Sequence, residues 1–493
     1  MNIAFFTNYI YTPHYETELE LIQVHLDKGD NVYQFICNSH LLSCDFNPKH
    51  DLLKCTHCIS KRLTGQKQLT NTQKYFTINI SDFHYKEIHS DLKINFATIE
   101  ELRSYKTDNF EIGDAALSSL VSFIRDPEPD LQIHETLLSN ILMSADYTYR
   151  YFLKKLAEYN IDTLYNFNGR FATNRAALRA AHKLNIICYI HERGNDFTTY
   201  ELFENVLPHE IMPFTKRTVD FWQNHAETEL NKIKIAHNFY EDRVVGKEQG
   251  WMSFITQQKK GLLPENWNSL EDNIVIFTSS EDEYVSIGEE WDLGVFVSQN
   301  ALILQLMNDP RLAEKKIWVR LHPNMRSMTQ RYLDRIYSTL KGNIGLILPE
   351  SPVNSYDLIN AASKVLTFGS TVGIEATYWG KTSILIGPGF YQHFKVTYNP
   401  ESYEDLVALV MKEDLKPLPQ ENTLQYGFYL NNFGIPFKIF KPKNLFEGDY
   451  KGINLDKTFD YDKWKTWSLK RGFHWFYHRL NMLNCKLKRN RYV

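Results

Sequence analysis

Residues 364–386 read KVLTFGSTVGIEATYWGKTSILI and carry the clearest structural signal in the chain. A short apolar run at 364–367 stops at a turn of glycine and hydroxyl residues, and a helical pattern follows over 372–379. A second apolar run, at 383–386, comes directly after that helix. This order of strand, helix and strand predicts a β-α-β unit and hence a parallel sheet.

The same alternation of strands and helices extends outward through both halves of the chain. We expect strands at 273–278, 316–321 and 345–348 in the second half, and at 2–6, 31–37, 163–166 and 186–190 in the first. The sequence therefore predicts two α/β domains with a cleft between them. Their limits are 1–258, with an irregular insertion at about 40–135, and 269–440, followed by a C-terminal tail at 441–493.

The composition is that of an ordinary globular protein and excludes several classes. Of 493 residues, 43% are hydrophobic and 23% charged, and the net charge of −4 argues against nucleic acid as a partner. We find no apolar run of about eighteen residues, so no membrane-spanning helix is expected. Six cysteines in a chain of this length do not form a disulfide scaffold, and the N-terminus lacks the pattern of an export signal. We therefore expect a cytoplasmic protein.

The turn at Gly369, Ser370 and Thr371 is a candidate anion site. It lies between a strand and the start of a helix, where backbone N–H groups and hydroxyls favour a phosphate. Glu375, one turn into the helix, is placed to reach a ribose or sugar hydroxyl. The alternative is an ordinary strand-to-helix turn with Ser370 as the N-cap.

Two further strand ends point to the same edge of the predicted sheet. One carries Arg320, His322, Pro323 and Asn324, and the other carries Ser279 and Ser280. The proline fixes the backbone after His322, whose imidazole would stabilise the charge on a departing phosphate. The alternative is a histidine that only caps a turn. Three such strand ends in one domain are harder to dismiss than any one of them.

In this order, the segments SSEDE (279–283), RLHPN (320–324) and 355–387 resemble the bacterial capsule polysaccharide biosynthesis family. The resemblance covers about residues 270–390 and implies a GT-B glycosyltransferase, with two Rossmann-like domains facing each other across a cleft. In such enzymes a His-Pro pair and a Ser/Thr-rich turn bind the nucleotide and its phosphate. The resemblance thus implies that His322, Pro323, Ser370 and Thr371 hold a nucleotide-sugar donor, CMP- or UDP-linked. The implied acceptor is a capsule or lipopolysaccharide glycan, or its lipid-linked primer.

Acceptor-side groups are expected in the N-terminal half. Glu16 is the first choice for the base that removes a proton from the acceptor hydroxyl, with His14, Glu192 and Asp196 behind it. His191, Glu192 and Arg193 follow a predicted strand and would hold a donor phosphate or an acceptor charge, or form an internal salt bridge. For Glu16 the alternative is an acid favoured by the helix dipole in a first turn.

Four of the six cysteines, Cys37, Cys44, Cys55 and Cys58, crowd into one short stretch. Cys55 and Cys58 have the spacing of a zinc knuckle, which predicts a structural zinc ion bound by all four. The alternative is a set of buried free thiols. Catalysis itself requires no metal, because side chains and helix N-termini can stabilise a GT-B leaving group.

The tail after Asp462 contains nine lysine and arginine residues, no acid, and several tryptophans. This pattern predicts a contact with the inner face of the cell membrane, although a C-terminal helix packed across the cleft is an alternative. Two rival functions stay open: a CDP-polyol phosphotransferase of the teichoic-acid type, and a catalytically silent, membrane-associated assembly scaffold.

Overall fold

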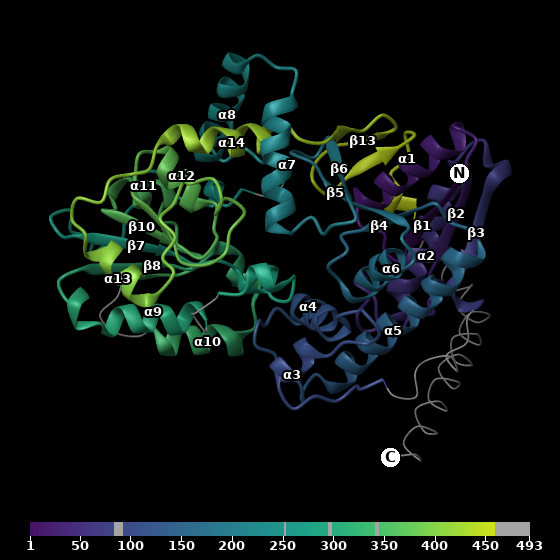
Figure 1. The fold of residues 1–493 in the computed structure, drawn as a ribbon, viewed down its shortest axis with the longest axis horizontal. Coiled ribbons are helices and arrows are strands. Elements are labelled where there is room, and N and C mark those ends of the chain that lie inside the picture. Colours follow the sequence, from purple (N-terminus) through teal and green to yellow (C-terminus); the bar gives the residue numbers. More distant parts are fainter. Residues whose placement is uncertain (83–91, 251–252, 294–297, 341–344, 459–493) are drawn as a thin grey trace.

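The computed structural model describes residues 1–82, 92–250, 253–293, 298–340 and 345–458. Two sheets dominate it, at opposite ends of the view in Figure 1. The first has seven strands in the order β12-β6-β5-β4-β1-β2-β3. Strands β1 to β5 are parallel, whereas β6 is antiparallel to both of its neighbours. Their bounds are Asn2–Thr7 (β1), Asn31–Ile36 (β2), Tyr75–Asn79 (β3), Thr163–Phe167 (β4), Ile187–Arg193 (β5), Thr199–Glu204 (β6) and Ile435–Pro436 (β12).

The second sheet is entirely parallel, with five strands in the order β11-β10-β7-β8-β9. The order reverses direction at β7, which is typical of a doubly wound sheet with its ligand site beyond the carboxyl ends of the central strands. The strands are Asn273–Phe277 (β7), Lys316–Arg320 (β8), Gly345–Ile347 (β9), Lys364–Thr367 (β10) and Ser383–Leu385 (β11).

Alternating side chains of the strands pack against helices on both faces of each sheet. In β1, Ala4 and Phe6 join a core with α4, α5 and α6, while Ile3 and Phe5 join another with α1. In the second sheet, Ile276 packs with α9, α10 and α13, and Phe277 packs with α11 and α12. Two helix-covered sheets with parallel central strands confirm the predicted GT-B architecture. The helices are His14–Asp27 (α1), Leu52–Gln66 (α2), Ile99–Ser104 (α3), Ile112–Ile124 (α4), Glu135–Glu158 (α5), Ala172–Lys183 (α6), Ile211–Asn224 (α7), Glu229–Val244 (α8), Gln299–Asn308 (α9), Gln330–Thr339 (α10), Ser355–Ala361 (α11), Val372–Tyr378 (α12), Tyr403–Met411 (α13) and Leu424–Asn432 (α14).

Two details of the first half differ from the expectation. The stretch at about 40–135, expected to be irregular, contains α2, β3, α3 and α4. Side-chain caps begin two of these helices: Asp51 accepts from Lys54 N at the start of α2, and Thr98 accepts from Glu101 N at the start of α3. Strand β5 runs through Arg193 instead of stopping at residue 190, because its last residues pair with β6.

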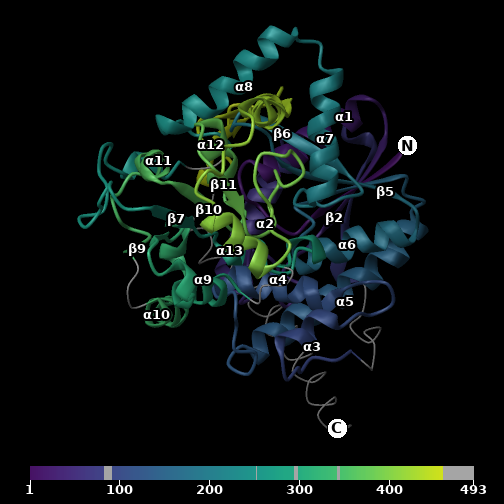
Figure 2. The same ribbon diagram turned by 60° about the vertical axis from the view of Figure 1, so that its left-hand side comes forward.

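The chain crosses between the sheets twice, and its second crossing returns it to the first sheet. Helices α7 and α8 extend from the upper side of the molecule in Figures 1 and 2, and α14 packs against both. After α14, β12 pairs with β6, and the hairpin of β13 (Phe440–Pro442) and β14 (Gly448–Tyr450) packs near α1. The Glu20 carboxylate fixes this return by accepting from Lys438 N, Ile439 N and Phe440 N at 2.6, 3.0 and 3.0 Å. The domain limits 1–258, 269–440 and 441–493 stay predictions. The chain returns to the first sheet at β12, before the predicted limit at residue 440.

The predicted membrane-binding tail lies outside the described residues from Lys463 onward. Within the described ranges, no helix is both long enough and apolar enough to cross a bilayer.

Candidate functional site

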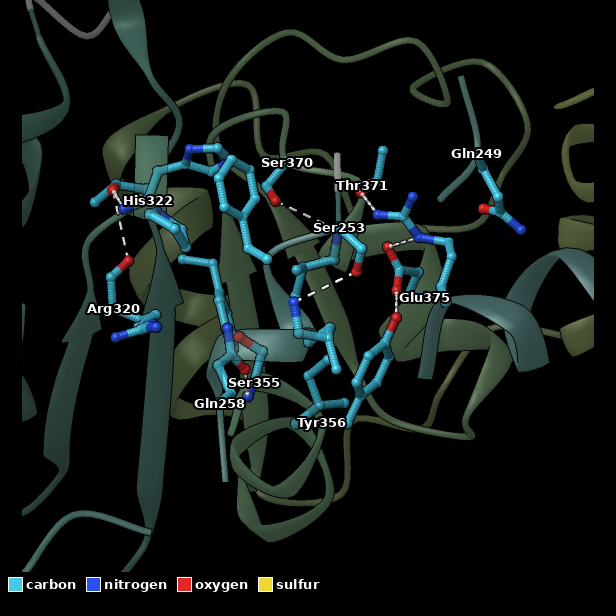
Figure 3. A pocket seen from close by; sticks show the side chains of 18 of the residues that line it. Gln249, Ser253, Gln258, Arg320, His322, Ser355, Tyr356, Ser370, Thr371 and Glu375 are labelled. Atoms are coloured by element: carbon cyan, nitrogen blue, oxygen red, sulfur yellow. Dashed lines mark hydrogen bonds and ion pairs between the residues drawn. The ribbon is translucent and has the colours of Figure 1, made fainter. Parts of the chain in front are cut away.

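A cavity of about 240 Å³ opens at the carboxyl ends of β7, β8 and β10 (Figure 3). The end of α8 and the segment at 253–258 close it from the other side. The sequence predicts a site at this edge of the sheet, because polar residues follow three strands that lie next to one another there. Its lining consists of Arg243, Lys247, Gln249, Ser253, Phe254, Ile255, Gln258, Phe277, Thr278, Glu283, Arg320, His322, Pro323, Ser355, Tyr356, Ile359, Ser370, Thr371, Val372 and Glu375.

The turn between β10 and α12 depends on Gly369. Its φ of +101° is a conformation that other residues rarely adopt, and a Cβ there would lie 2.2 Å from Pro388 O. Tyr391 OH donates to Ser370 O at 2.6 Å and holds the turn from the other side. The Ser370 hydroxyl accepts from Val372 N only at 3.4 Å, so Ser370 is a weak cap and its side chain faces the cavity (Figure 3).

Glu375 belongs to a network that the sequence did not reveal. It is 1% exposed, its Oε1 accepts from Arg243 Nε at 2.9 Å, and its Oε2 accepts from Tyr356 OH. Arg243 also donates from Nη2 to Thr371 Oγ1 at 2.9 Å. An arginine from α8 therefore fixes both Glu375 and Thr371 at the cavity wall. The predicted contact of Glu375 with a ribose or sugar hydroxyl stays a prediction.

His322 presents a neutral N–H donor. Its Nδ1 accepts from Asn324 N at 3.2 Å, so its proton is on Nε2. Burial, together with the charges of Arg320 and Arg125, lowers the pKa of His322 to about 4. His322 therefore both caps the turn and lines the cavity. Its Nδ1 accepts the hydrogen bond of the turn, and its Nε2 carries the proton that can be donated. The ring of Phe254 packs edge-on against the imidazole, with centroids 5.7 Å apart.

The other predicted donor-side residues brace the strand ends. Arg320 donates to Leu348 O at 2.7 Å and to Ser351 O at 3.2 Å, and burial lowers its pKa to about 10, which leaves it charged at neutral pH. Ser279 donates to Phe368 O at 2.9 Å, Ser280 donates to Asp282 Oδ1 at 2.6 Å, and Asn324 donates to Glu283. None of these last three is among the described residues that line the cavity, whereas Thr278 beside them is.

In the first domain, the structure places Glu16 in an internal ion pair. Glu16 is 1% exposed, and its Oε1 lies 3.0 Å from Lys61 Nζ and 3.1 Å from Thr12 Oγ1. Lys61 also pairs with Asp456 at 2.9 Å. Burial raises the pKa of Glu16. This enclosure gives no geometric support to its predicted role as the base.

The remaining acceptor-side candidates gather at the end of β5. His191 is buried, its Nε2 lies 2.8 Å from Tyr9 OH, and burial lowers its pKa to about 3. Arg193 donates to Leu445 O at 3.0 Å. Glu192 accepts from Asn168 Nδ2 at 2.5 Å and lies 3.8 Å from His14 Nε2. Its side chain keeps 20% of its surface exposed, against 8% for His14, so Glu192 is the more accessible of the two.

The structure gives no further support for a zinc ion bound by the four cysteines. Cys37, Cys44, Cys55 and Cys58 are free thiols. Among the residues that the structure describes, no group of three or more His, Cys, Asp or Glu side chains is arranged to hold a metal ion. The structural zinc stays a prediction from the cysteine spacing.

Sequence reasoning missed Arg243, Lys247 and the segment at 253–258, which all fall within the predicted first domain, 1–258. The only local signal was a basic residue near the end of an amphipathic helix, which is common on protein surfaces. Their place at the cavity depends on how α8 packs against the second domain.

Comparison with known proteins identifies a family over the central and C-terminal part of the chain. Residues 199–429 match the family described as "Capsule polysaccharide biosynthesis protein". This region contains all the strands of the second sheet and the whole cavity lining. The match confirms the family that the motifs indicate. No curated protein matches the chain in sequence.

Among solved structures, the chain is similar to the β-Kdo 2,4 transferase KpsC of Thermosulfurimonas dismutans, with 14% identity and a TM-score of 0.37 over 54% of this chain and 79% of that one. The UDP-GlcNAc 2-epimerase of Neisseria meningitidis, bound to UDP-GlcNAc, has 11% identity and a TM-score of 0.25 over 93% of this chain and 98% of that one. At these values neither similarity identifies a substrate.

Proposed function

We propose, from the premise that residues 199–429 belong to the capsule polysaccharide biosynthesis family, that this chain is a glycosyltransferase. It transfers a sugar from a CMP- or UDP-linked donor to a bacterial surface polysaccharide, capsule or lipopolysaccharide, or to its lipid-linked primer. The observation that carries the proposal is the cavity where His322, Ser370, Thr371 and Arg243 converge.

The residues of this cavity suit a departing nucleotide phosphate. The negative charge develops on a phosphate oxygen, which fixed N–H and O–H donors stabilise best in a site that excludes water. His322 supplies its Nε2–H, and Ser370 supplies a hydroxyl. Thr371 accepts from Arg243, so its own hydroxyl proton is directed elsewhere and serves the ligand. The charges of Arg243 and Arg320 favour the anion, so the proposed reaction requires no metal ion.

The acceptor enters from the side of the first domain. Closure of the two domains would exclude water, since hydrolysis of the donor competes with transfer. A lipid-linked acceptor places the reaction at the inner face of the cell membrane, and the basic, aromatic residues after Asp462 would contact that surface.

A thermal-shift panel of CMP, UDP, GDP and CDP tests the nucleotide site directly. A ligand that binds the native state raises the melting temperature by mass action, and we expect this effect for CMP or UDP. The double variant His322→Ala, Ser370→Ala should lose the effect while staying folded, with a melting temperature lowered only by the loss of the His322 cap. No shift with any of the four nucleotides would refute the donor site.

Turnover separates the proposal from its rivals. Release of nucleotide from CMP- or UDP-sugars supports a glycosyltransferase, whereas release from CDP-glycerol or CDP-ribitol alone supports a polyol phosphotransferase. Normal polysaccharide assembly in cells that carry the double variant would instead indicate a scaffold.

A further inference from the structure

The turn after β4, formed by Asn168, Gly169 and Arg170, lies at the same sheet edge as the end of β5. Asn168 and Gly169 have φ angles of +57° and +72°, in the left-handed region that asparagine and glycine adopt more readily than other residues. A side chain at Gly169 would be strained by this φ angle and would also meet the Leu207 side chain, so the turn favours glycine there.

Both the oxygen and the nitrogen of the Asn168 side-chain amide form hydrogen bonds. Its Oδ1 accepts from Arg170 N at 3.1 Å, and its Nδ2 donates to Glu192 Oε1 at 2.5 Å. Because Oδ1 is satisfied by a backbone N–H, the amide orientation is fixed and Nδ2 must face Glu192. Asn168 is 8% exposed, so this contact is shielded from solvent.

A continuous series of hydrogen bonds leads from Glu192 to the wall of the nucleotide cavity. Arg170, which follows the turn, donates from Nη1 to the backbone oxygen of Glu283. Glu283 lines the cavity, and its side chain accepts from Asn324, two residues after His322. Glu192 and His322 therefore belong to facing sheet edges that touch at Arg170 and Glu283.

The surroundings of Glu192 suit a group that gains and loses a proton. His14 of α1, Tyr9 after β1, Arg193 of β5 and Arg170 of the turn are the titratable and charged groups around it. Burial raises the pKa of Glu192, while the Asn168 hydrogen bond and the charges of Arg193 and Arg170 oppose that rise. Burial and the nearby charge of Arg193 hold the pKa of His14 well below the usual value, which makes it a weaker base than an ordinary histidine.

We propose that Glu192 is the catalytic base of the transfer and that Asn168 is its positioning residue. The assignment rests on the proposed glycosyltransferase function. Glu192 takes the proton of the attacking hydroxyl as its oxygen bonds to the anomeric carbon of the donor. The bond from that carbon to the phosphate oxygen breaks, and its electron pair leaves on the phosphate held beside His322.

The test uses the full-length protein, the CMP- or UDP-sugar whose nucleotide gives the largest thermal shift, and a capsule or lipopolysaccharide glycan as the acceptor. Nucleotide release is followed under single-turnover conditions. We expect Glu192→Gln to slow release by about 100-fold or more, the usual size of a general-base effect, while the nucleotide Kd stays within about twofold. Glu204→Gln, which alters a carboxylate on the neighbouring strand β6, is the matched control and should release nucleotide at the normal rate.

Two further measurements separate a base from a structural residue. Formate should restore part of the rate to Glu192→Ala, because it supplies a carboxylate where the side chain is missing. Asn168→Ala removes a hydrogen bond that favours the charged form, so the acidic limb of the pH–rate profile should move to higher pH.

The possible results decide between the assignments. Release by Glu192→Gln at the normal rate, or an unmoved acidic limb in Asn168→Ala, overturns the proposal for Glu192. A large loss in His14→Gln without one in Glu192→Gln assigns the base to His14 instead. Absence of release by the unaltered protein from every donor refutes the glycosyltransferase function, and the assignment of Glu192 with it.

Discussion

Two buried carboxylates, Glu16 in the first domain and Glu375 in the second, are each neutralised by a cation from a distant segment. Glu16 pairs with Lys61 at 3.0 Å and Glu375 pairs with Arg243 at 2.9 Å. Both glutamates lie in the first turn of a helix that follows a strand end. Only Glu375 borders the cavity, whereas the Glu16 pair is closed over by Asp456 from the returning chain. The same chemistry therefore stabilises the fold in one domain and shapes a cavity wall in the other.

The largest effect is expected from Lys61→Met, which removes the cation of the enclosed pair. The Lys61 side chain is 0% exposed, so Glu16 would be left as an uncompensated buried charge. The free energy of unfolding should fall by about 3–5 kcal/mol, as measured by urea denaturation, with nucleotide affinity unchanged. Lys54→Met alters an exposed lysine of the same helix and is the control. A loss of nucleotide affinity in folded Lys61→Met would contradict the conclusion that the Glu16–Lys61 pair serves the fold alone.

Arg243→Met should give a smaller loss of stability and a clear loss of binding. The Arg243 side chain is 32% exposed, and solvent screens part of its pair, so we expect a loss of about 2 kcal/mol. Without Arg243, Glu375 and Thr371 lose their fixed positions, and nucleotide affinity should fall about tenfold, a difference of about 1.4 kcal/mol. Lys234→Met, an exposed site on α8, should change neither quantity. Isothermal titration with CMP and UDP measures the affinity, and unchanged binding would show that the α8 wall is dispensable.

Glu20 extends the comparison to a buried carboxylate held by backbone N–H groups. Glu20→Gln keeps one acceptor oxygen and replaces the other with an amide that cannot accept. The three contacts weaken, and the free energy of unfolding should fall by about 1–2 kcal/mol. Glu100→Gln, exposed on α3, is the control for charge alone. A loss no larger than in Glu100→Gln would mean that Glu20 does not hold the returning chain.

The smallest effect concerns the pH dependence of donor binding. With its pKa at about 4, His322 is neutral at pH 6 and above, in contrast to a histidine of the usual pKa of about 6.5. CMP- and UDP-sugars carry no phosphate that titrates between about pH 6 and 8, so their affinity should change less than about twofold over this range. Binding should strengthen only as the pH falls towards 4, where His322 gains charge. A marked rise between pH 7 and 6 would show that His322 is protonated in the site.

Local sequence signals were sufficient to predict the second sheet and one edge of its cavity. The turn at Gly369, Ser370 and Thr371 and the His322-Pro323 pair are visible in sequence because strand ends and turn residues depend on near neighbours. The same reasoning misjudged the insertion at about 40–135, where side-chain caps begin α2 and α3 and where β3 pairs with β2 of the first sheet. The sequence placed Glu16 before Glu192 as a candidate base, and nothing near Glu16 in sequence reveals that it pairs with Lys61.

The sequence by itself determined the two-domain α/β architecture, the family that residues 199–429 match, and the position of the turn at Gly369, Ser370 and Thr371. These follow from apolar periodicity and turn chemistry, which act over a few residues. Only the tertiary structure decided which charged groups are paired and which face a cavity. Arg243 and Glu375 are separated by 132 residues, and Lys61 and Asp456 by 395. Electrostatic pairing and burial depend on distances in space, and those are set only when the helices and the returning chain pack together.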